Sequence, residues 1–244
     1  MAAEATPSFL YLPGLPAAGE ELVLPEEEAR YVTRVCRARA GECAQASDGR
    51  GALARLRLLE VRGGVRARVE SREARARARV CHVLCGAPEG GRGDWLVEKL
   101  AELGVARFRP VECARGRWPA HGERLARWRR LAVAALRQSR SPHLMEVLEP
   151  TPLAEALAGL PPEANRWLAD AEGPPADRAG LGETGMAAGL IGPSGGLAPD
   201  ERQGALAGGF RPVRLAEARL RTETAALAWA ALWAGSGSRP DRAV

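Results

Sequence analysis

The chain has 244 residues, 46% of them hydrophobic and 27% charged, a composition typical of a folded globular protein and not of a disordered one. No apolar run approaches the roughly 20 residues that span a bilayer, and the first residues lack the basic and apolar regions of a signal peptide, so we expect a cytoplasmic protein without a membrane partner. The net charge is +5, and Lys99 is the single lysine. Arginine-based charge is compatible with a nucleic-acid partner, but also with a genome that replaces lysine by arginine throughout.

The cysteines and histidines do not predict a metal site. Five cysteines are an odd, scattered set, and the pair in "CHVLC" has no second pair to complete a ligand group. On a strand, Cys81, Val83 and Cys85 share one face, so buried thiols are the better interpretation. The three histidines lie in unrelated contexts, and we expect no metal.

Residues 1–72 are predicted to form a small β-rich domain. A strand at 21–25 precedes a helix at 25–39, whose glutamates occupy the first turn and whose arginines occupy the last, as the helix dipole favours. Asp48-Gly49 and Gly63-Gly64 predict two hairpin turns. Along the hairpin strands apolar residues alternate with arginines, so one face is core and the other is either a solvated face or a nucleic-acid-binding one.

Residues 73–240 have a different pattern, in which strands alternate with helices. Strands are predicted at 79–87, 105–113, 166–170, 187–192 and 210–215, and helices at 95–103, 122–140 and 222–235, the first of them capped by Asp94. The last helix is apolar nearly all round, and the tail from Gly235 is expected to be disordered. This alternation predicts an α/β domain with a parallel sheet covered on both faces.

The stretch "GLIGPSGGLAPDE", residues 189–201, is a candidate ligand loop. Its glycines fit neither the dinucleotide fingerprint nor a P-loop. It is instead a strand end that turns into a short helix starting at Pro199, Asp200 and Glu201, and the carboxyl ends of parallel strands are where α/β sheets bind ligands. A backbone cradle beside acidic residues suits S-adenosylmethionine, which has hydrogen-bonding edges and a positive centre. The alternative is a glycine loop that serves chain geometry alone.

A second motif, "VRLAEARLRTETAALAW", follows about twenty residues later. A strand is expected to end at Leu215, and Thr222 can cap the following helix, with Glu223 at its positive end. Arg221 lies just ahead of this cap. We therefore expect its side chain to reach into the neighbouring crevice.

Together, "IGPSGGLAPDE" and "LRTETA", with "EKLAELGV" and "AALRQSR" upstream, resemble the RsmE-type family of 16S ribosomal RNA uracil-N3 methyltransferases, which are SPOUT methyltransferases. The resemblance covers nearly the whole chain, including "RYVTRVCRARAG" near the N-terminus. The chain departs from the family pattern at four positions: Ser194 stands where glutamate is usual, Ala216 for glycine, Ala218 for arginine, and Arg137 where an acidic residue is common.

The resemblance implies an α/β fold of the SPOUT type, a parallel sheet with a C-terminal trefoil knot, preceded by a small PUA-like β-barrel that binds RNA. It also implies a homodimer, S-adenosyl-L-methionine as cofactor, and 16S ribosomal RNA or the small ribosomal subunit as partner. The implied cofactor-binding residues are Leu168, Ala169, Asp170, Ile191, Gly192, Pro193, Gly195, Gly196, Leu215, Ala216, Leu220, Arg221, Thr222 and Thr224. The implied RNA-binding residues are Arg34 and Arg37, expected one turn apart on the first helix, with Lys99 and Arg140.

Two catalytic candidates follow from the chemistry of this reaction. Uracil N3 can attack only after losing its proton, and Arg221 could then stabilise the charge that spreads onto O2 and O4. An ion pair with Glu223 or a phosphate contact is the alternative role for Arg221. The general base is either Glu223 or solvent, and Lys99 could simply pair with Glu102. The acceptor could also be another base or a ribose, and the chain could instead be a non-catalytic ribosomal RNA-binding assembly factor.

Overall fold

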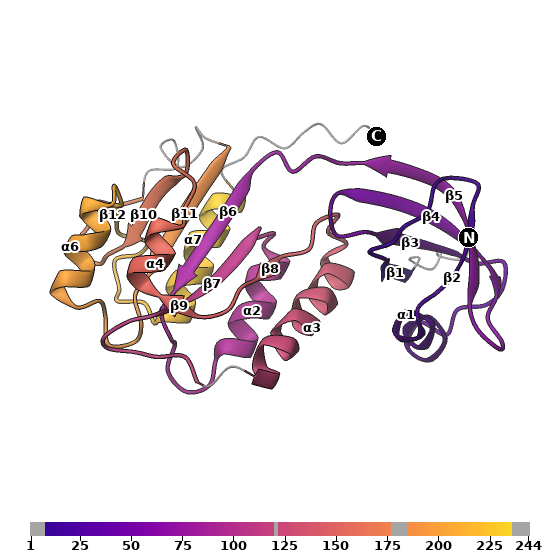
Figure 1. Ribbon diagram of the computed structural model, residues 1–244, viewed down its shortest axis with the longest axis horizontal. Coiled ribbons are helices and arrows are strands. Elements are labelled where there is room, and N and C mark those ends of the chain that lie inside the picture. The colour runs from indigo at the N-terminus through magenta and orange to yellow at the C-terminus, as the bar shows by residue number, and fades with distance from the viewer. Residues whose placement is uncertain (1–7, 120–121, 177–184, 236–244) are drawn as a thin grey trace. The chain divides into compact units, whose positions relative to one another are not determined.

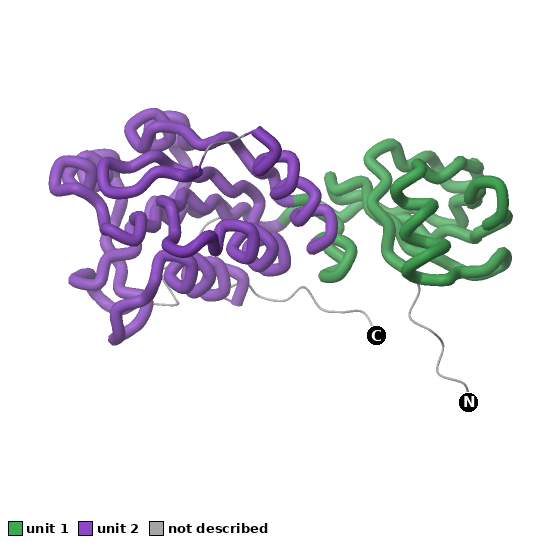
Figure 2. Tube along the Cα trace, turned by 90° about the horizontal axis from the view of Figure 1, so that it is seen from below, with its two compact units in different colours: residues 1–77, 136–144 green, residues 78–135, 145–244 purple. Residues whose placement is uncertain are grey.

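The computed structural model describes residues 8–119, 122–176 and 185–235, so the tail beyond Gly235 that was predicted to be disordered lies outside the described residues. The chain divides into two compact units (Figure 2). Unit 1 comprises residues 1–77 and 136–144, and unit 2 comprises residues 78–135 and 145–244. A segment from the middle of the chain thus groups with the N-terminal unit.

Unit 1 contains a five-stranded sheet with the order β1-β3-β4-β5-β2 (Figure 1). Its strands are β1 (Ser8–Tyr11), β2 (Glu21–Val23), β3 (Cys43–Ser47), β4 (Ala52–Glu60) and β5 (Arg66–Ala74). β1 pairs with β3 in parallel, and the other pairs are antiparallel. Both predicted hairpins form, and Gly49 and Gly63 have the left-handed backbone conformation that such turns need.

The predicted alternation along β4 and β5 is confirmed. Leu56, Leu58 and Val69 are fully buried, whereas the arginines between them face outward. Those arginines are ion-paired: Glu70 forms salt bridges with Arg57 at 2.7 Å and with Arg55 at 3.1 Å. The remaining pairs on this face are Arg66–Glu60 and Arg68–Glu21. The guanidinium row is therefore a solvated face that is largely neutralised by its own glutamates.

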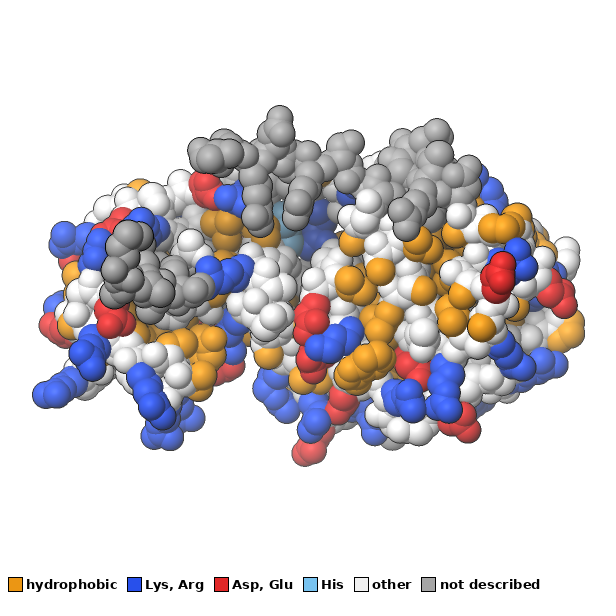
Figure 3. All heavy atoms as spheres, turned by 180° about the vertical axis from the view of Figure 1, so that it is seen from behind, with side chains coloured by type: hydrophobic (Ala, Val, Ile, Leu, Met, Phe, Trp, Pro, Cys, Tyr) orange, Lys and Arg blue, Asp and Glu red, His pale blue; other side chains and the backbone are white. Residues whose placement is uncertain are grey.

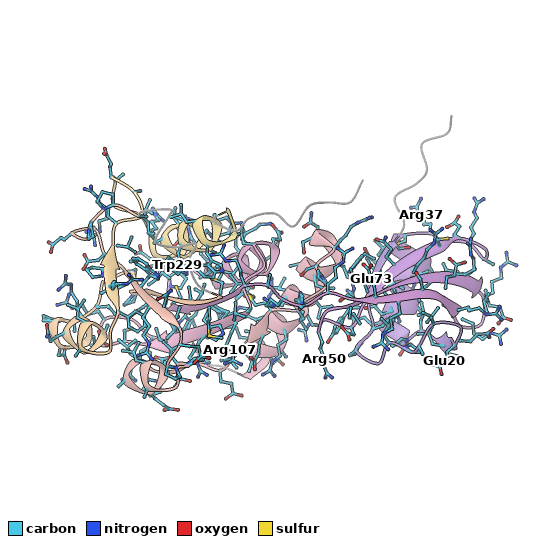
Figure 4. The ribbon with its side chains drawn as sticks, turned by 90° about the horizontal axis from the view of Figure 1, so that it is seen from above. Glu20, Arg37, Arg50, Glu73, Arg107 and Trp229 are labelled. Carbon is cyan, nitrogen blue, oxygen red and sulfur yellow. The ribbon has the colours of Figure 1, made fainter. Side chains whose placement is uncertain are left out.

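The first helix is shorter than predicted. It consists of α1 (Glu26–Arg30) and a π-helical continuation, Tyr31–Val35. The chain then turns through Arg37, whose φ of 53° is left-handed, and the amide of Ala38 closes the last turn on the carbonyl of Val32 at 3.1 Å. Arg37, labelled in Figure 4, therefore lies beyond the helix, and the expectation that it sits one helical turn from Arg34 is wrong.

Unit 2 is built on a seven-stranded parallel sheet, as predicted for an α/β domain. The order is β12-β10-β11-β6-β7-β8, with β9 pairing to β7. The strands are β6 (Val80–Cys85), β7 (Arg107–Glu112), β8 (Glu146–Val147), β9 (Thr151–Pro152), β10 (Asn165–Ala169), β11 (Met186–Ile191) and β12 (Arg211–Val213). The helices are α2 (Gly93–Glu102), α3 (Gly122–Ser139), α4 (Leu153–Ala158), α6 (Pro199–Ala207) and α7 (Thr222–Gly235). No helix within the described ranges is both long and apolar enough to cross a membrane.

Helices cover both faces of this sheet (Figure 1). On one face, α7 lies so close to β11 that a Cβ on Gly189 would come within 2.2 Å of the indole nitrogen of Trp229, which is labelled in Figure 4. The next residue, Leu190, points to the other face, where it packs in a cluster with Leu153 of α4 and Ala205 of α6. Alternate residues of β11 thus pack against helices on opposite faces of the sheet. A strand that is buried on both faces is apolar along its whole length, which explains its continuous apolar sequence.

The cysteines of β6 are buried, as predicted: Cys81 is 3% exposed and Cys85 is fully enclosed. The predicted cap at Asp94 is wrong. α2 begins one residue earlier, at Gly93, and the Asp94 carboxylate instead accepts a hydrogen bond from the indole of Trp128 at 2.8 Å and pairs with Arg127 at 2.6 Å. Asp94 therefore joins α2 to α3, because both of its carboxylate oxygens are bound by side chains of α3.

Candidate functional site

A cavity of about 760 Å³ opens in unit 2 where β10, β11 and β12 end. This volume is within the range of ordinary small-molecule sites. Most of its lining comes from the ends of those three strands, the segments that follow them and the first turn of α7. The cavity therefore lies at the carboxyl edge of a parallel sheet, where the strand order predicts a ligand crevice.

Most of the residues that the sequence assigned to a cofactor site line this cavity. They are Leu168, Ala169, Asp170, Ile191, Gly192, Pro193, Gly195, Gly196, Leu215, Ala216, Leu220, Arg221 and Thr222. Thr224 does not line the cavity and is exposed. It lies two residues after Thr222 in α7, and residues two apart on a helix point in different directions. Both catalytic candidates, Arg221 and Glu223, belong to the lining.

The start of α7 differs from the expectation. Thr222 is not the cap: its hydroxyl donates to the carbonyl of Gly192 at 3.1 Å, and its side chain is buried. In the first hydrogen bond of the helix, the amide of Ala225 donates to the carbonyl of Arg221 at 2.8 Å, so Arg221 takes the cap position. Thr222 thereby fastens the helix to the glycine loop, and Arg221 stands at the junction of the two.

The glycines of the loop allow three segments to pack closely. A Cβ on Gly195 would lie 2.9 Å from the carbonyl oxygen of Arg115, and Gly196 has a left-handed φ of 73°. A Cβ on Gly86 would lie 2.4 Å from the backbone nitrogen of Pro193. Chain geometry, the alternative raised by the sequence, thus accounts for part of this glycine content, while the same backbone forms a wall of the cavity.

The acidic residues beside the loop are not those expected. Neither Asp200 nor Glu201 lines the cavity; Glu201 instead accepts the amides of Ala114 at 2.7 Å and Ala198 at 2.8 Å. The carboxylates in the lining are Glu89, Asp170, Glu172 and Glu223. Among the described residues, no group of three or more acidic, histidine or cysteine side chains is arranged to hold a metal ion.

Glu223 is 2% exposed and is ion-paired to Arg92, whose Nη1 donates to its Oε1 at 2.8 Å. Arg92 comes from the segment before α2, on a different part of the chain. Arg221 is exposed at the cavity, and within the described parts of the chain its guanidinium has no ion pair. The alternative in which Arg221 serves only as the partner of Glu223 is therefore not the arrangement seen.

None of the four predicted RNA-binding residues is in the lining of the cavity. Arg34, Arg37 and Arg140 are exposed residues of unit 1, and Arg140 directly follows α3 with a left-handed φ of 54°. Lys99 is in α2 of unit 2, where its ammonium donates to Glu98 and Glu102 at 2.7 Å each. These hydrogen bonds, chiefly that to Glu102, raise the pKa of Lys99.

The sequence interpretation missed several charged residues of the lining. They include Glu89, Arg115, Arg202 and Arg214. Glu89 and Arg115 follow β6 and β7, so the strand-end rule applied to every strand would have found them. Arg202 is bound to Asp170 at 2.8 Å, a contact between α6 and the end of β10 that no sequence spacing indicates.

Comparison with known proteins gives a consistent result. Residues 76–234 match a family model described as an RNA methyltransferase domain. Ribosomal RNA small subunit methyltransferase E of Mycobacterium bovis is 32% identical over 237 residues, covering 89% of this chain and 87% of that protein. The Synechocystis protein of the same name is 28% identical over 231 residues, with 89% and 76% covered.

A solved structure is similar over the same length. The crystal structure of a ribosomal RNA small subunit methyltransferase E from Neisseria gonorrhoeae, bound to S-adenosyl methionine, has a TM-score of 0.84 and 29% identity with this chain. The similarity covers 93% of this chain and 96% of the Neisseria gonorrhoeae chain.

Proposed function

Because this chain belongs to the RNA methyltransferase family of ribosomal RNA small subunit methyltransferase E, and is an S-adenosylmethionine-dependent ribosomal RNA methyltransferase, we propose that it methylates N3 of a uridine in 16S ribosomal RNA. The observation that carries this choice of acceptor is Arg221, an arginine at the cavity without an ion pair among the described residues. Its exposed guanidinium is suited to a base that becomes negatively charged during the reaction.

The residues around the cavity fit S-adenosylmethionine. The cavity has room for a nucleoside with an amino-acid arm, and its lining includes Gly192, Gly195 and Gly196, which offer only backbone to the edges of an adenine and a ribose. Carboxylates in the lining match a positive centre and an amino group. When bound, this cofactor supplies an electrophilic methyl group on a sulfonium sulfur.

Arg221 would act on the acceptor base. The N3 lone pair of uracil becomes available when the N3 proton leaves and charge moves onto O2 and O4. A preorganised guanidinium beside these oxygens stabilises that charge as it develops, which is where hydrogen-bond donors lower a barrier most. Since the carbonyl of Arg221 is fixed as the helix cap of α7, the base of this side chain is held in place.

Glu223 is the carboxylate that we propose takes the N3 proton, with solvent as the competing acceptor. It is buried in the cavity wall two residues after Arg221, and its Oε1 accepts a hydrogen bond from Arg92 at 2.8 Å. The substitution Glu223→Gln removes the proton-accepting carboxylate and keeps a side chain of nearly the same size and shape.

RNA binding is proposed to involve Arg34, Arg37, Lys99 and Arg140, through contacts with phosphates. We also propose the finer features implied by the resemblance: the trefoil knot, the PUA-like barrel within residues 1–72, a methyltransferase domain at 73–240, and a homodimer acting in the cytoplasm. The nearly all-apolar composition of α7 supports the homodimer, and sedimentation at several concentrations tests it.

The decisive experiment for the acceptor is mass mapping of small-subunit RNA from cells with and without the gene, followed by methylation of the unmodified subunits with purified protein. We expect one uridine to lose a base methyl group and to regain it in vitro. A methyl group that maps to a ribose or to another base would replace the uridine N3 assignment. No difference at all would contradict a 16S ribosomal RNA substrate.

A further inference from the structure

We propose that Arg115 and Arg117 bind the RNA phosphates that flank the target nucleotide, at the rim of the cavity. This inference rests on the proposed function, because it names the surface that receives the RNA substrate. Both arginines lie between β7 and α3, on a segment that the sequence motifs did not single out.

The segment 113–118 is held rigidly against the cavity. The backbone of Cys113 and Gly116 exchanges two hydrogen bonds, at 3.1 and 3.2 Å, which closes a tight turn around Arg115. Glu201 fixes the amide of Ala114 at 2.7 Å. The indole of Trp118, which is 5% exposed, donates to the carbonyl of Cys85 at 3.0 Å. A surface fixed in this way loses little conformational freedom when it binds a ligand.

The same turn is in direct contact with the glycine loop. The carbonyl of Arg115 packs against Gly195, at a spacing that leaves no room for a Cβ. Its guanidinium makes one long hydrogen bond, 3.4 Å, to the carbonyl of Leu197. Arg115 is therefore exposed at the cavity while its backbone is anchored to the cavity wall.

The charges of this turn are not neutralised by the protein. In the ranges that the structure describes, neither Arg115 nor Arg117 has a carboxylate within ion-pair distance, and both are exposed. The arginines on the β4–β5 face differ, since each is bonded to Glu21, Glu60 or Glu70. On the face drawn in Figure 3, basic and acidic side chains are likewise interspersed. An arginine is therefore available to bind a phosphate only where no carboxylate of the protein already pairs with it.

The chemistry of the reaction needs contacts at this place. An enzyme that modifies a base edge must take the nucleotide out of its stack, and the neighbouring phosphates must then be held while the base enters the cavity. Planar guanidiniums bind phosphate oxygens in pairs and keep their charge at every relevant pH. Two arginines with one residue between them can follow successive phosphates of the backbone.

The test is the RNA affinity of the double variant Arg115→Ala/Arg117→Ala, measured with a 16S ribosomal RNA transcript at several salt concentrations. We expect at least a roughly tenfold loss of affinity, as charge-assisted hydrogen bonds are lost. The slope of log affinity against log salt should fall by about 1.4 to 1.8, the value for two phosphate contacts. Saturating RNA should restore most of the turnover rate, and calorimetry should show that affinity for S-adenosylmethionine falls much less than affinity for RNA.

The matched control is Arg66→Ala/Arg68→Ala, which also removes two arginines but from the ion-paired strand face. Its RNA affinity should stay within about twofold of the wild type. Arg115→Lys/Arg117→Lys should retain the salt slope and lose part of the affinity. An unchanged slope in the alanine variant, or a larger loss in the control, would overturn the proposal, as would an equal loss of cofactor affinity.

The outcome is separable from that of the proposed function. A chain that binds RNA through Arg115 and Arg117 but methylates no uridine N3 refutes the acceptor and keeps the surface. Methylation of uridine N3 with full RNA affinity in the alanine variant refutes the surface and keeps the acceptor.

Discussion

Arg92 and Glu223 join two distant parts of the chain through a single ion pair of 2.8 Å between Nη1 and Oε1. The carboxylate is almost completely buried, whereas the guanidinium side chain is 48% exposed. The pair connects the segment before α2 with the first turn of α7. A buried carboxylate is stable only with a partner, and Arg92 is the partner that the burial of Glu223 requires.

Removal of Arg92 should therefore destabilise the protein through Glu223. We expect Arg92→Ala to lower the free energy of unfolding by about 1 to 3 kcal/mol, less than for a fully buried pair because Arg92 is half-exposed. Urea denaturation measures this change. Arg92→Lys should lose less stability than Arg92→Ala. Adding Glu223→Gln to Arg92→Ala should recover part of the lost free energy of unfolding. A double variant no more stable than Arg92→Ala would contradict the explanation.

Arg221→Ala should slow methyl transfer by about 100- to 1,000-fold, with little change in affinity for S-adenosylmethionine. The reason is that its guanidinium would meet charge that exists mainly in the transition state. Arg221→Lys should restore little, because one ammonium cannot span two carbonyl oxygens.

Single-turnover methylation with saturating RNA and cofactor is the measurement, and a thermal melt shows that the variant is folded. A rate within about threefold of wild type would assign Arg221 a structural role and leave uridine activation without a residue.

Two glycine-to-alanine substitutions should have opposite effects on stability. At Gly189 the new Cβ would lie 2.2 Å from the indole nitrogen of Trp229, so Gly189→Ala should cost about 1 to 3 kcal/mol by forcing α7 away from the sheet. Gly204 lies within α6 and a Cβ there meets nothing within 4 Å. Gly204→Ala should therefore stabilise the protein by roughly 0.5 to 1 kcal/mol. Thermal melts that move in the same direction would contradict this packing.

The buried thiols should react only when the protein unfolds. Burial raises the pKa of Cys113 to about 12 and raises that of Cys85 as well, so neither forms thiolate near pH 8. A thiol reagent at pH 8 should modify the partly exposed Cys36 and Cys43 first. Mass spectrometry identifies the modified residues, and early labelling of Cys85 or Cys113 would contradict their burial.

The same shift has a consequence for stability at high pH. The folded-state pKa of Cys113 lies above its unfolded value, so the unfolded chain loses this proton first. The stability that it contributes is complete below about pH 9 and is lost as pH rises toward 12.

The class of fold could be predicted from the sequence because it depends on local patterns. Apolar runs bounded by helices identified β6, β7, β10, β11 and β12, and glycine turns identified the β3–β4 and β4–β5 hairpins. β1 of unit 1, with four residues, was missed. In unit 2 the missed elements were also short: β8, β9 and α4 hold two to six residues each. Segments of that length carry too little periodicity to be recognised, and only their pairing with β7 and packing on it defines them.

The candidate site was predictable where it consists of strand ends and not where it depends on side-chain partners. Residues after β11 and β12 were located because parallel strands end at a common edge, and those at the end of β10 came from the family resemblance. By contrast, Glu201 pairs with the amide of Ala114, and Glu223 with Arg92. These partners lie far apart in the chain, and nothing in the local sequence distinguishes one arginine or carboxylate from its many neighbours.

The central place of β6 in the parallel sheet affects how the chain reaches its folded state. β6 pairs on one side with β7, which follows directly, and on the other with β11, where Val80 lies opposite Met186. During synthesis, one hydrogen-bonding edge of β6 therefore waits unpaired until the last quarter of the chain emerges from the ribosome. Such distant pairings are slow to form, and an open apolar edge invites intermolecular pairing. We expect the nascent chain, and any fragment that stops before β11, to be the form of this protein that aggregates or needs a chaperone.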